Sequence, residues 1–479
     1  MSRHTKIVAT LGPASSDPQV LERMIRAGVD VVRLNFSHGR SEDHVARANL
    51  VREAAARVGR PVGILADLQG PKIRVGKFAD GKVTLEKGAR FILDAKCELG
   101  DIERVGLDYK DLPKDVASGN VLLLDDGRIV LDVVRVVGPE IFTTVRHGGE
   151  LSNNKGINRQ GGGLSAPALT AKDMDDIRTA ASMGADYLAV SFPKSAADMY
   201  MAKQLISAAG GHALTIAKIE RVEAVAALEE IIDASDGVMV ARGDLAVEVG
   251  DAAVPALQKR MIRMAREKNK LAITATQMME SMIVSPVPTR AEVSDVANAV
   301  LDGTDAVMLS AETAAGKYPV ETIESMARIC LEAEKSAEVT LEREFLNRIF
   351  TRIDQSISMA AIWTAHHLNV KAIAALTESG STALWMSRLN CGVPVYALTP
   401  IPEAQTKMCL YRAVFPLLMK QTHTDRDALL YDAEQLLIEA GVVENGDLIA
   451  LTIGEPIGTP GGTNTLKIVR VGEHQPPVA

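Results

Sequence analysis

The sequence predicts an α/β protein: a (β/α)8 TIM barrel with an inserted small β domain and a C-terminal α/β domain. Three observations lead to this prediction. Short apolar runs alternate eight times with helical stretches over the first 340 residues or so, which is the count of a (β/α)8 barrel. The stretch 71–166 lacks helical periodicity and is rich in turn signals. The alternation starts again after residue 343.

The barrel prediction rests on apolar runs of the kind that strands buried on both faces show. These runs lie at 6–12, 31–37, 62–68, 187–192, 215–220, 237–242, 271–277 and 306–312. Helical stretches accompany them near 17–27, 41–58, 170–183, 195–209, 221–232, 255–268, 289–301 and 319–338. We therefore expect a catalytic barrel made of residues 1–70 and 167–342.

The interruption at 71–166 is expected to form the inserted domain. Dipeptides such as Asp80-Gly81 and Asp126-Gly127 mark tight turns between short strands. Inserted domains of this kind often close over an active site. We therefore predict a small β-barrel that acts as a lid.

The last part of the chain, 343–479, is predicted to be a regulatory α/β domain. Its helices are expected at 355–368, 381–390, 403–412 and 425–440, and its strands at 371–377, 394–399, 447–454 and 464–471. Both tryptophans, Trp363 and Trp385, fall within it.

Composition limits the function classes. The 479 residues carry a formal net charge of −8, which argues against a nucleic-acid partner, since phosphate binding needs basic patches. The first residues lack the apolar core of a signal peptide, and no apolar stretch is long enough to cross a membrane. The four cysteines are scattered, without a C-x-x-C pair, so zinc and a disulfide framework are not expected. We expect a cytoplasmic protein with reduced thiols.

Polar residues follow most of the predicted barrel strands, where α/β barrels carry their chemistry. Glu220 and Asp244 follow neighbouring strands and could hold a hard divalent cation such as Mg²⁺. Arg33 suits a phosphate and Lys218 a developing anion. Gly243 would let a backbone N–H approach a ligand. Together these residues predict metal-assisted chemistry on a small phosphorylated anion.

Each of these residues also has a plainer interpretation. The run Arg242-Gly243-Asp244 could be an adhesion signal, which a cytoplasmic location excludes, or a solvated turn. Lys218 and Glu220 lie two residues apart, on the same side of a strand, and could form a surface salt bridge. The agreement of seven strand ends favours a site.

The motifs then resemble a known family. VVRLNFSHG, LADLQGPKIRVG, SNNKGIN, TIAKIE, VMVARGDLAVE, ATQMMESM, the long stretch 288–319 and TESGST occur in order along the whole chain, and together they look like pyruvate kinase. The resemblance implies transfer of the phosphoryl group of phosphoenolpyruvate to ADP, giving pyruvate and ATP. The rival interpretation, a Mg²⁺-dependent lyase or aldolase acting on pyruvate enolates, would not need an inserted lid.

The resemblance also implies roles for matching residues. Glu220 and Asp244 would bind Mg²⁺, with Mn²⁺ as an alternative, and Lys218 would stabilise the enolate. The substrate would meet Arg33, Gly243, Asp244 and Thr276, while Thr276 and Ser310 would belong to the proton path. The nucleotide side would be lined by Asn35, Ser37, His38, Arg74 and Lys155. A homotetramer is implied by resemblance alone.

One departure from the common pattern concerns potassium. The potassium ligands of many family members match Asn35, Ser37, Asp67 and the backbone carbonyl of Leu68. Those members have a glutamate where this sequence has Lys72, whose ammonium could replace a monovalent cation. We therefore predict that activity does not require potassium, although Lys72 could simply be a solvated hinge residue.

The sequence also predicts a binding site for an allosteric effector. The loop that carries Thr377, Ser379, Gly380, Ser381 and Thr382 lies between a strand and a helix. Hydroxyls and N–H groups at a helix start bind anions well, although ordinary N-capping explains them too. In the family a matching loop holds the phosphate of an activator, so we expect a phosphorylated allosteric effector of unknown identity.

Overall fold

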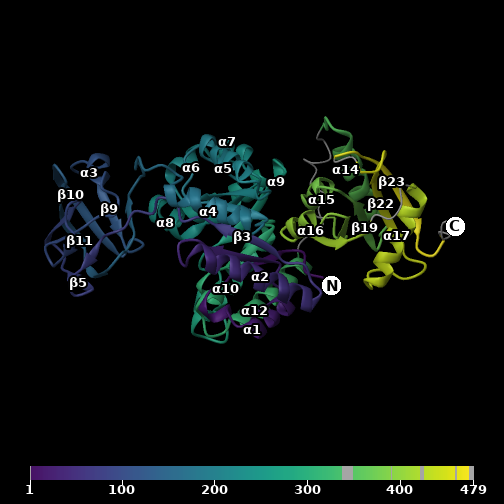
Figure 1. Ribbon diagram of the computed structural model, residues 1–479, viewed down its shortest axis with the longest axis horizontal. Helices are drawn as coiled ribbons and strands as arrows, with labels where there is room; N and C mark the ends of the chain where they lie inside the picture. The colour runs from purple at the N-terminus through teal and green to yellow at the C-terminus, as the bar shows by residue number, and fades with distance from the viewer. Residues whose placement is uncertain (1, 337–348, 390, 421–424, 459–460, 474–479) are drawn as a thin grey trace. The chain divides into compact units, whose positions relative to one another are not determined.

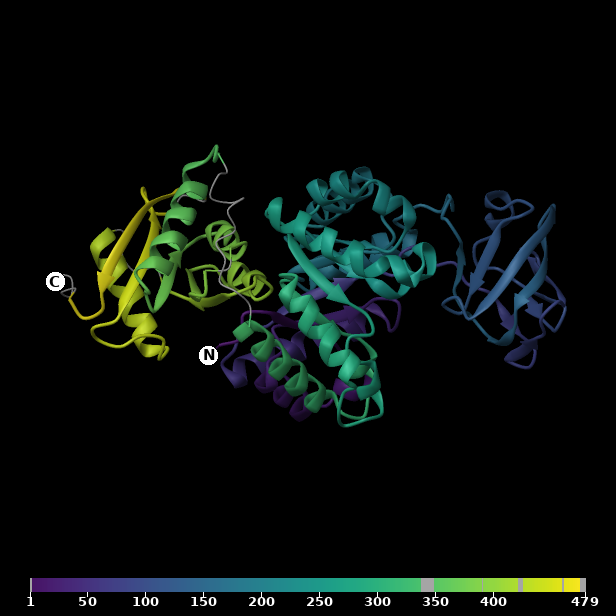
Figure 2. The same cartoon turned by 180° about the vertical axis from the view of Figure 1, so that it is seen from behind.

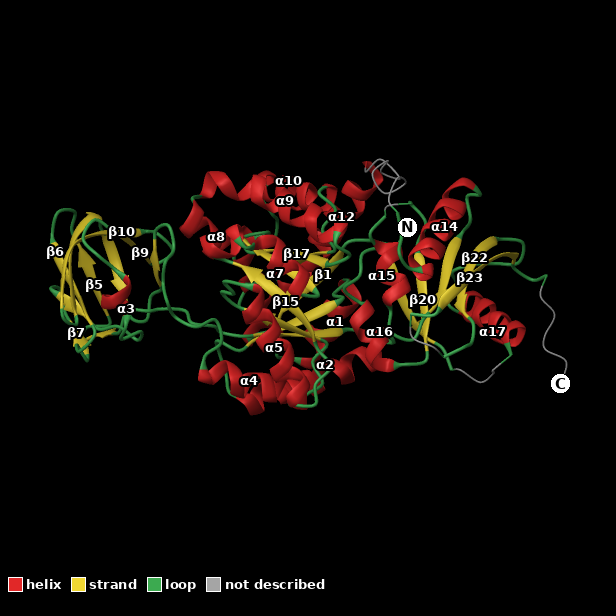
Figure 3. Ribbon diagram, turned by 90° about the horizontal axis from the view of Figure 1, so that it is seen from above, coloured by secondary structure: helices red, strands yellow, loops and turns green. Residues whose placement is uncertain are grey.

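The computed structural model describes residues 2–336, 349–389, 391–420, 425–458 and 461–473. The barrel prediction is confirmed: eight strands form a closed sheet in the order β1-β18-β17-β16-β15-β14-β3-β2. These strands are β1 (Lys6–Thr10), β2 (Val31–Asn35), β3 (Gly63–Asp67), β14 (Tyr187–Val190), β15 (Leu214–Ile219), β16 (Gly237–Ala241), β17 (Leu271–Ala275) and β18 (Ala306–Leu309). Figure 3 shows them in yellow.

Helices accompany the barrel strands as the sequence predicts. They are α1 (Pro18–Ala27), α2 (Ser41–Val58), α4 (Ala171–Ser182), α5 (Ala196–Ala208), α6 (Val222–Ala226), α7 (Leu228–Ala234), α8 (Arg242–Val249), α9 (Val254–Glu267), α10 (Arg290–Leu301), α11 (Ala311–Ala314) and α12 (Pro319–Ser336). Short 3-10 turns lie at η1 (Pro13–Ser15), η2 (Asp251–Ala253) and η3 (Glu280–Ile283). The single helix expected at 221–232 is two helices, α6 and α7. None of the described helices has the length and apolar content that a membrane crossing requires.

Several strands end earlier than the apolar runs suggest. β16 stops at Ala241, and Arg242-Gly243-Asp244 forms the first turn of α8. β17 stops at Ala275, because Thr276 and Gln277 have positive φ angles of 68° and 55°, which break the extended backbone. The polar residues at these positions therefore lie on the loops and short helices beyond the strands.

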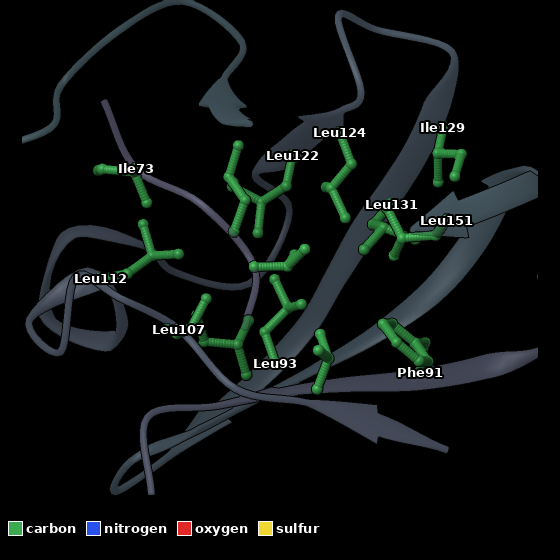
Figure 4. Packing of buried hydrophobic residues seen from close by; sticks show 14 of the residues in the cluster. Ile73, Phe91, Leu93, Leu107, Leu112, Leu122, Leu124, Ile129, Leu131 and Leu151 are labelled. Carbon is green, nitrogen blue, oxygen red and sulfur yellow. The ribbon is translucent and has the colours of Figure 1, made fainter. Parts of the chain in front are cut away.

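The insert consists of short strands, as predicted, with one added helix (Figure 1). Its main sheet has the order β13-β9-β10-β11-β6-β8, and β12-β5 and β4-β7 form separate pairs. The elements are β4 (Lys77–Phe78), β5 (Lys82–Leu85), β6 (Arg90–Asp94), β7 (Leu99–Gly100), β8 (Arg104–Val105), α3 (Leu112–Asp115), β9 (Val121–Leu124), β10 (Ile129–Val137), β11 (Glu140–His147), β12 (Gly149–Ser152) and β13 (Ile157–Arg159). Figure 4 shows its own apolar core, which includes Phe91, Leu93, Leu122 and Leu131.

The C-terminal domain has a five-stranded sheet in the order β21-β20-β19-β22-β23, with β23 antiparallel to β22. Its strands are β19 (Ala372–Leu376), β20 (Val395–Thr399), β21 (Val414–Leu418), β22 (Leu448–Gly454) and β23 (Thr463–Arg470), and its helices are α14 (Ile353–His367), α15 (Ser381–Ser387), α16 (Pro402–Met408) and α17 (Arg426–Glu439). α14 packs against β22 and β23 (Figure 2). β21, an edge strand that contains Pro416, is not among the strands predicted from the sequence.

Two compact units divide the chain. One contains Met1–Ala66, Met183–Tyr187 and Ile262–Ala479, and the other contains Asp67–Ser182 and Leu188–Met261. The first therefore holds β1, β2, β17 and β18 with the C-terminal domain, and the second holds β15 and β16 with the insert. The boundary expected at 342/343 lies outside the described residues.

Candidate active site

Lys218 is the centre of a buried charged cluster in the second unit. It lies on β15, and its Nζ is 2.7 Å from Ser191 Oγ, 3.0 Å from Glu220 Oε1 and 3.3 Å from Asp67 Oδ1. The Lys218 side chain is 12% exposed, against 1% for Asp67 and 2% for Glu220. The surface salt bridge is therefore excluded: this ammonium is held inside the barrel mouth by two carboxylates and a hydroxyl.

Glu220 is held from two sides. Its Oε2 accepts the backbone N–H of Phe192 at 2.9 Å, and Oε1 faces Lys218. Burial raises the pKa of Glu220 to about 7, Lys218 opposes the shift, and the negative charge of Asp244 adds to it. The effect of Asp244 on this pKa indicates that the two carboxylates belong to one electrostatic cluster.

Asp244 lies in the first turn of α8, three residues after the end of β16. Its Oδ1 is 3.1 Å from Lys72 Nζ, and both side chains are about one quarter exposed (22% and 28%). Gly243 precedes it at a helix start, where backbone N–H groups point toward approaching anions. The Arg-Gly-Asp run is thus neither an adhesion loop nor a simple turn.

The chemistry of this donor set fits a hard divalent cation. Mg²⁺ is commonly held in proteins by one or two carboxylates, with substrate oxygens and waters completing its shell. Glu220 and Asp244 supply two such carboxylates. Within the described residues no group of three or more His, Cys, Asp or Glu side chains could hold a metal.

The monovalent-cation residues are divided between the units. Asp67 contacts Lys218, while the Leu68 carbonyl accepts the Ser191 hydroxyl at 2.8 Å. Lys72 contacts Asp244. Asn35 and Ser37 belong to the other unit. The ammonium of Lys72 therefore lies next to a candidate divalent-metal ligand.

The first unit contributes the loop after β2. Arg33, on β2, donates from Nη1 to Thr10 Oγ1 at 3.1 Å. Asn35 Oδ1 accepts the Ser37 N–H at 3.0 Å, and the Asn35 carbonyl accepts the His38 N–H at 3.2 Å. Asn35, Ser37 and His38 thus form one compact turn, with His38 exposed.

In a second part of this unit, one buried carboxylate binds the backbone of Ser310. Glu312, 2% exposed, accepts the Ser310 N–H at 2.7 Å and the Met279 N–H at 3.2 Å. Burial raises its pKa. The buried Oγ of Ser310 has no hydrogen-bond partner among the described residues. Glu312 is not among the site residues predicted from the sequence.

Arg74 and Lys155 come together in the insert. Residue Arg74 forms a β-bridge with Gly156, and the Val75 N–H donates to the Lys155 carbonyl at 2.9 Å. Arg74 Nη1 donates to the Asn154 carbonyl at 3.2 Å, and Lys155 Nζ lies 2.7 Å from Asp125 Oδ1. Two cations predicted for the nucleotide therefore share one edge of the insert.

The predicted effector loop borders a cavity of about 50 Å³ in the C-terminal domain. Gly380, with φ 84°, precedes α15, and its N–H donates to Thr377 Oγ1 at 2.9 Å. The Ser381 N–H approaches Ser379 Oγ at 3.4 Å. The cavity is lined by Leu376, Thr377, Glu378, Thr382, Leu398, Pro400, Met419, Leu429, Ile453, Gly454, Ile457, Gly458, Gly461, Gly462 and Thr463. Thr377 and Thr382 of the loop therefore face a cavity, together with one carboxylate.

Comparison with known proteins covers nearly the whole chain. The family model for the barrel domain of pyruvate kinase matches residues 2–323, and the model for its alpha/beta domain matches residues 355–469. The chain is 54% identical over 475 residues to pyruvate kinase II of Salmonella typhimurium, covering 98% of this chain and 99% of that one. It is 52% identical to a pyruvate kinase of Haemophilus influenzae (94% and 96% covered) and 43% identical to one of Mycobacterium intracellulare (99% and 99% covered).

Proposed function

For this chain, which belongs to the pyruvate kinase family and transfers the phosphoryl group of phosphoenolpyruvate to ADP in the last step of glycolysis, we propose that Lys218 stabilises the enolate left by that transfer. One observation carries the assignment: the Lys218 ammonium is buried and held by three side chains. A cation fixed where negative charge develops stabilises the transition state more than it stabilises the substrate. The lyase alternative has no comparable support.

Both reactants are negatively charged, which gives Arg33 and a divalent metal ion a role in the transfer. Phosphoryl transfer depends mainly on positioning and charge neutralisation. We propose that Arg33 contacts the transferring phosphoryl group, while Gly243, Asp244 and Thr276 contact the substrate carboxylate. Glu220 and Asp244 would hold Mg²⁺, or Mn²⁺ in its place, and the bound metal would offset the negative charge of the phosphoryl oxygens.

The proton that converts the enolate into pyruvate needs a path to the carbon. We propose that Thr276 and Ser310 form this path. Support comes from the buried hydroxyl of Ser310, which has no hydrogen-bond partner among the described residues, and from Glu312, which fixes the Ser310 backbone.

The nucleotide would lie against Asn35, Ser37, His38, Arg74 and Lys155. Arg74 and Lys155 belong to the predicted lid, whose closure would exclude water as a competing phosphoryl acceptor. The proposal also includes a cytoplasmic homotetramer, on family resemblance alone.

The role of Lys218 is tested by Lys218→Met, assayed by pyruvate formation from phosphoenolpyruvate and ADP. The matched control is Lys203→Met, since Lys203 lies on α5 of the same unit and pairs with Asp236, and its side chain is 35% exposed. We expect kcat to fall by at least about 100-fold in the first variant, as for loss of an oxyanion donor, and to stay unchanged in the second. An active Lys218→Met enzyme would contradict the assignment.

Potassium independence is tested in a potassium-free buffer, with tetramethylammonium chloride keeping the ionic strength constant. The ammonium of Lys72, 3.1 Å from Asp244, would supply the fixed positive charge that a monovalent cation otherwise provides. We expect equal turnover with and without added potassium. Turnover that appears only with potassium would remove this role for Lys72.

The effector proposal concerns a phosphate held by Thr377, Ser379, Gly380, Ser381 and Thr382. The cavity beside this loop supports it. Ser381→Asp places a carboxylate where the phosphate would bind, so activation by sugar phosphates and nucleotides should disappear while basal turnover stays. Unchanged activation would show that the effector binds elsewhere.

A further inference from the structure

We propose that Ser191 is a positioning residue for Lys218, whose hydroxyl determines where the ammonium lies as the enolate forms. Ser191 directly follows β14 and is 1% exposed. Its Oγ is 2.7 Å from Lys218 Nζ, closer than either carboxylate of the cluster. The inference rests on the proposed role of Lys218.

The hydroxyl is oriented for this task. Ser191 Oγ donates to the Leu68 carbonyl at 2.8 Å. A serine hydroxyl has one hydrogen to donate and two lone pairs to accept with. Because its hydrogen points to Leu68, a lone pair is left to face the Lys218 ammonium. The direction of both hydrogen bonds is therefore fixed by the chemistry of the groups.

Ser191 also differs from Asp67 and Glu220 in charge. The two carboxylates hold Lys218 and partly neutralise it. Ser191 is neutral, so it orients the ammonium and leaves its charge for the developing enolate. Loss of the hydroxyl should thus misplace the cation during the chemical step, while the electrostatic attraction for the anionic substrate stays.

The backbone around Ser191 is tightly constrained. Gly70 has φ 66°, and a Cβ built on it would lie 2.7 Å from Ser191 Cβ. The next residue, Phe192, has φ 54°, and its N–H donates to Glu220 at 2.9 Å. The dipeptide Ser191-Phe192 therefore contacts both the proposed enolate stabiliser and a proposed metal ligand, with little room to shift.

The test compares Ser191→Ala with Ser235→Ala. Ser235 is an equally buried serine of the same unit, and its hydroxyl donates to the Ile231 carbonyl at 2.6 Å. Both variants lose a hydroxyl that bonds to a backbone carbonyl, but Ser191→Ala alone changes the Lys218 cluster. We expect kcat to fall about 10- to 100-fold in Ser191→Ala, with KM for phosphoenolpyruvate within twofold, and neither to change in Ser235→Ala.

Ser191→Cys gives a graded result, because a thiol is a weak acceptor. Its kcat should lie between those of the parent and Ser191→Ala, and it replaces Ser191→Ala if that variant does not fold. A kcat within twofold of the parent, a loss equal to that of Ser235→Ala, or a loss confined to KM would overturn the inference. If Lys218→Met keeps its kcat, the proposed function of Lys218 fails; if Lys218→Met is inactive and Ser191→Ala is not, only the role of Ser191 fails.

Discussion

The ion pair between Arg388 and Asp305 allows a direct test of how the C-terminal domain is stabilised. Their side chains are 2% and 1% exposed. Arg388 Nη1 donates to Asp305 Oδ2 at 3.0 Å and to the Lys270 carbonyl at 2.6 Å. Asp305 also accepts the backbone N–H of Ala272 at 2.9 Å. Replacing Arg388 by methionine would leave the Asp305 carboxylate charged and buried.

The expected cost follows from that burial. Removing one partner of a buried pair costs about 3–5 kcal/mol of unfolding free energy, since the other charge is left uncompensated. Arg426→Met is the control: it lies in the same C-terminal domain, its pair with Asp427 is 48% and 65% exposed, and such a pair contributes at most about 1 kcal/mol. Adding Asp305→Asn to Arg388→Met should recover part of the loss, because the uncompensated carboxylate charge is then removed as well.

The assay is urea unfolding followed by tryptophan emission. The chain has two tryptophans, Trp363 and Trp385, and both lie in the C-terminal domain, so the signal reports on that domain. The free energy comes from linear extrapolation to zero urea. A loss below about 1 kcal/mol in Arg388→Met, within the range of an exposed pair, would refute the reasoning.

Three further predictions concern stability and the site. In Glu312→Gln, one of the two backbone N–H groups that Glu312 accepts, those of Ser310 and Met279, loses its acceptor. The free energy of unfolding should therefore fall by about 1–3 kcal/mol, and kcat should fall as well. An unchanged kcat would show that Glu312 is not a positioning residue. Burial lowers the pKa of Lys6 from 10.5 to about 8. Between pH 8 and 10 the unfolded state therefore binds more protons than the folded state, and stability rises with pH. Denaturation at each pH should show that the free energy of unfolding of the parent rises by about 2 kcal/mol relative to that of Lys6→Met over this range. Gly70→Ala should lose both stability and kcat because it meets Ser191, whereas Gly59→Ala, with φ 73° and nothing within 4 Å, should lose only about 1 kcal/mol of stability.

The sequence predicted the barrel, and it pointed to candidate site residues, because both depend on local patterns. Apolar runs predict buried strands, and charges after those runs mark the mouth of the barrel. β21 was missed because Pro416 weakens a strand pattern, and Pro is accepted here on the edge strand of the sheet.

Contacts between side chains that lie far apart in the sequence could not be predicted in the same way. A serine after a strand carries no signal of its own, so the contact of Ser191 with Lys218 required coordinates. The same holds for Lys72, whose residue type suggested a cation site while its contact with Asp244 depends on the path of the chain between the insert and α8. Short-range spacing identifies candidate residues, and tertiary packing decides which of them meet.

The helix α15 is linked to the barrel strand β18 through a buried ion pair, so a displacement of one affects the other. It begins at Ser381, beside the proposed effector loop, and ends next to Arg388. Arg388 is bound to Asp305, which directly precedes β18, and β18 ends next to Ser310. A helix of this length spans about 10 Å and a strand of this length about 13 Å. Any rigid-body displacement of α15 must therefore either carry the start of β18 with it or break a buried ion pair, and Arg388→Met would make the two elements mechanically independent.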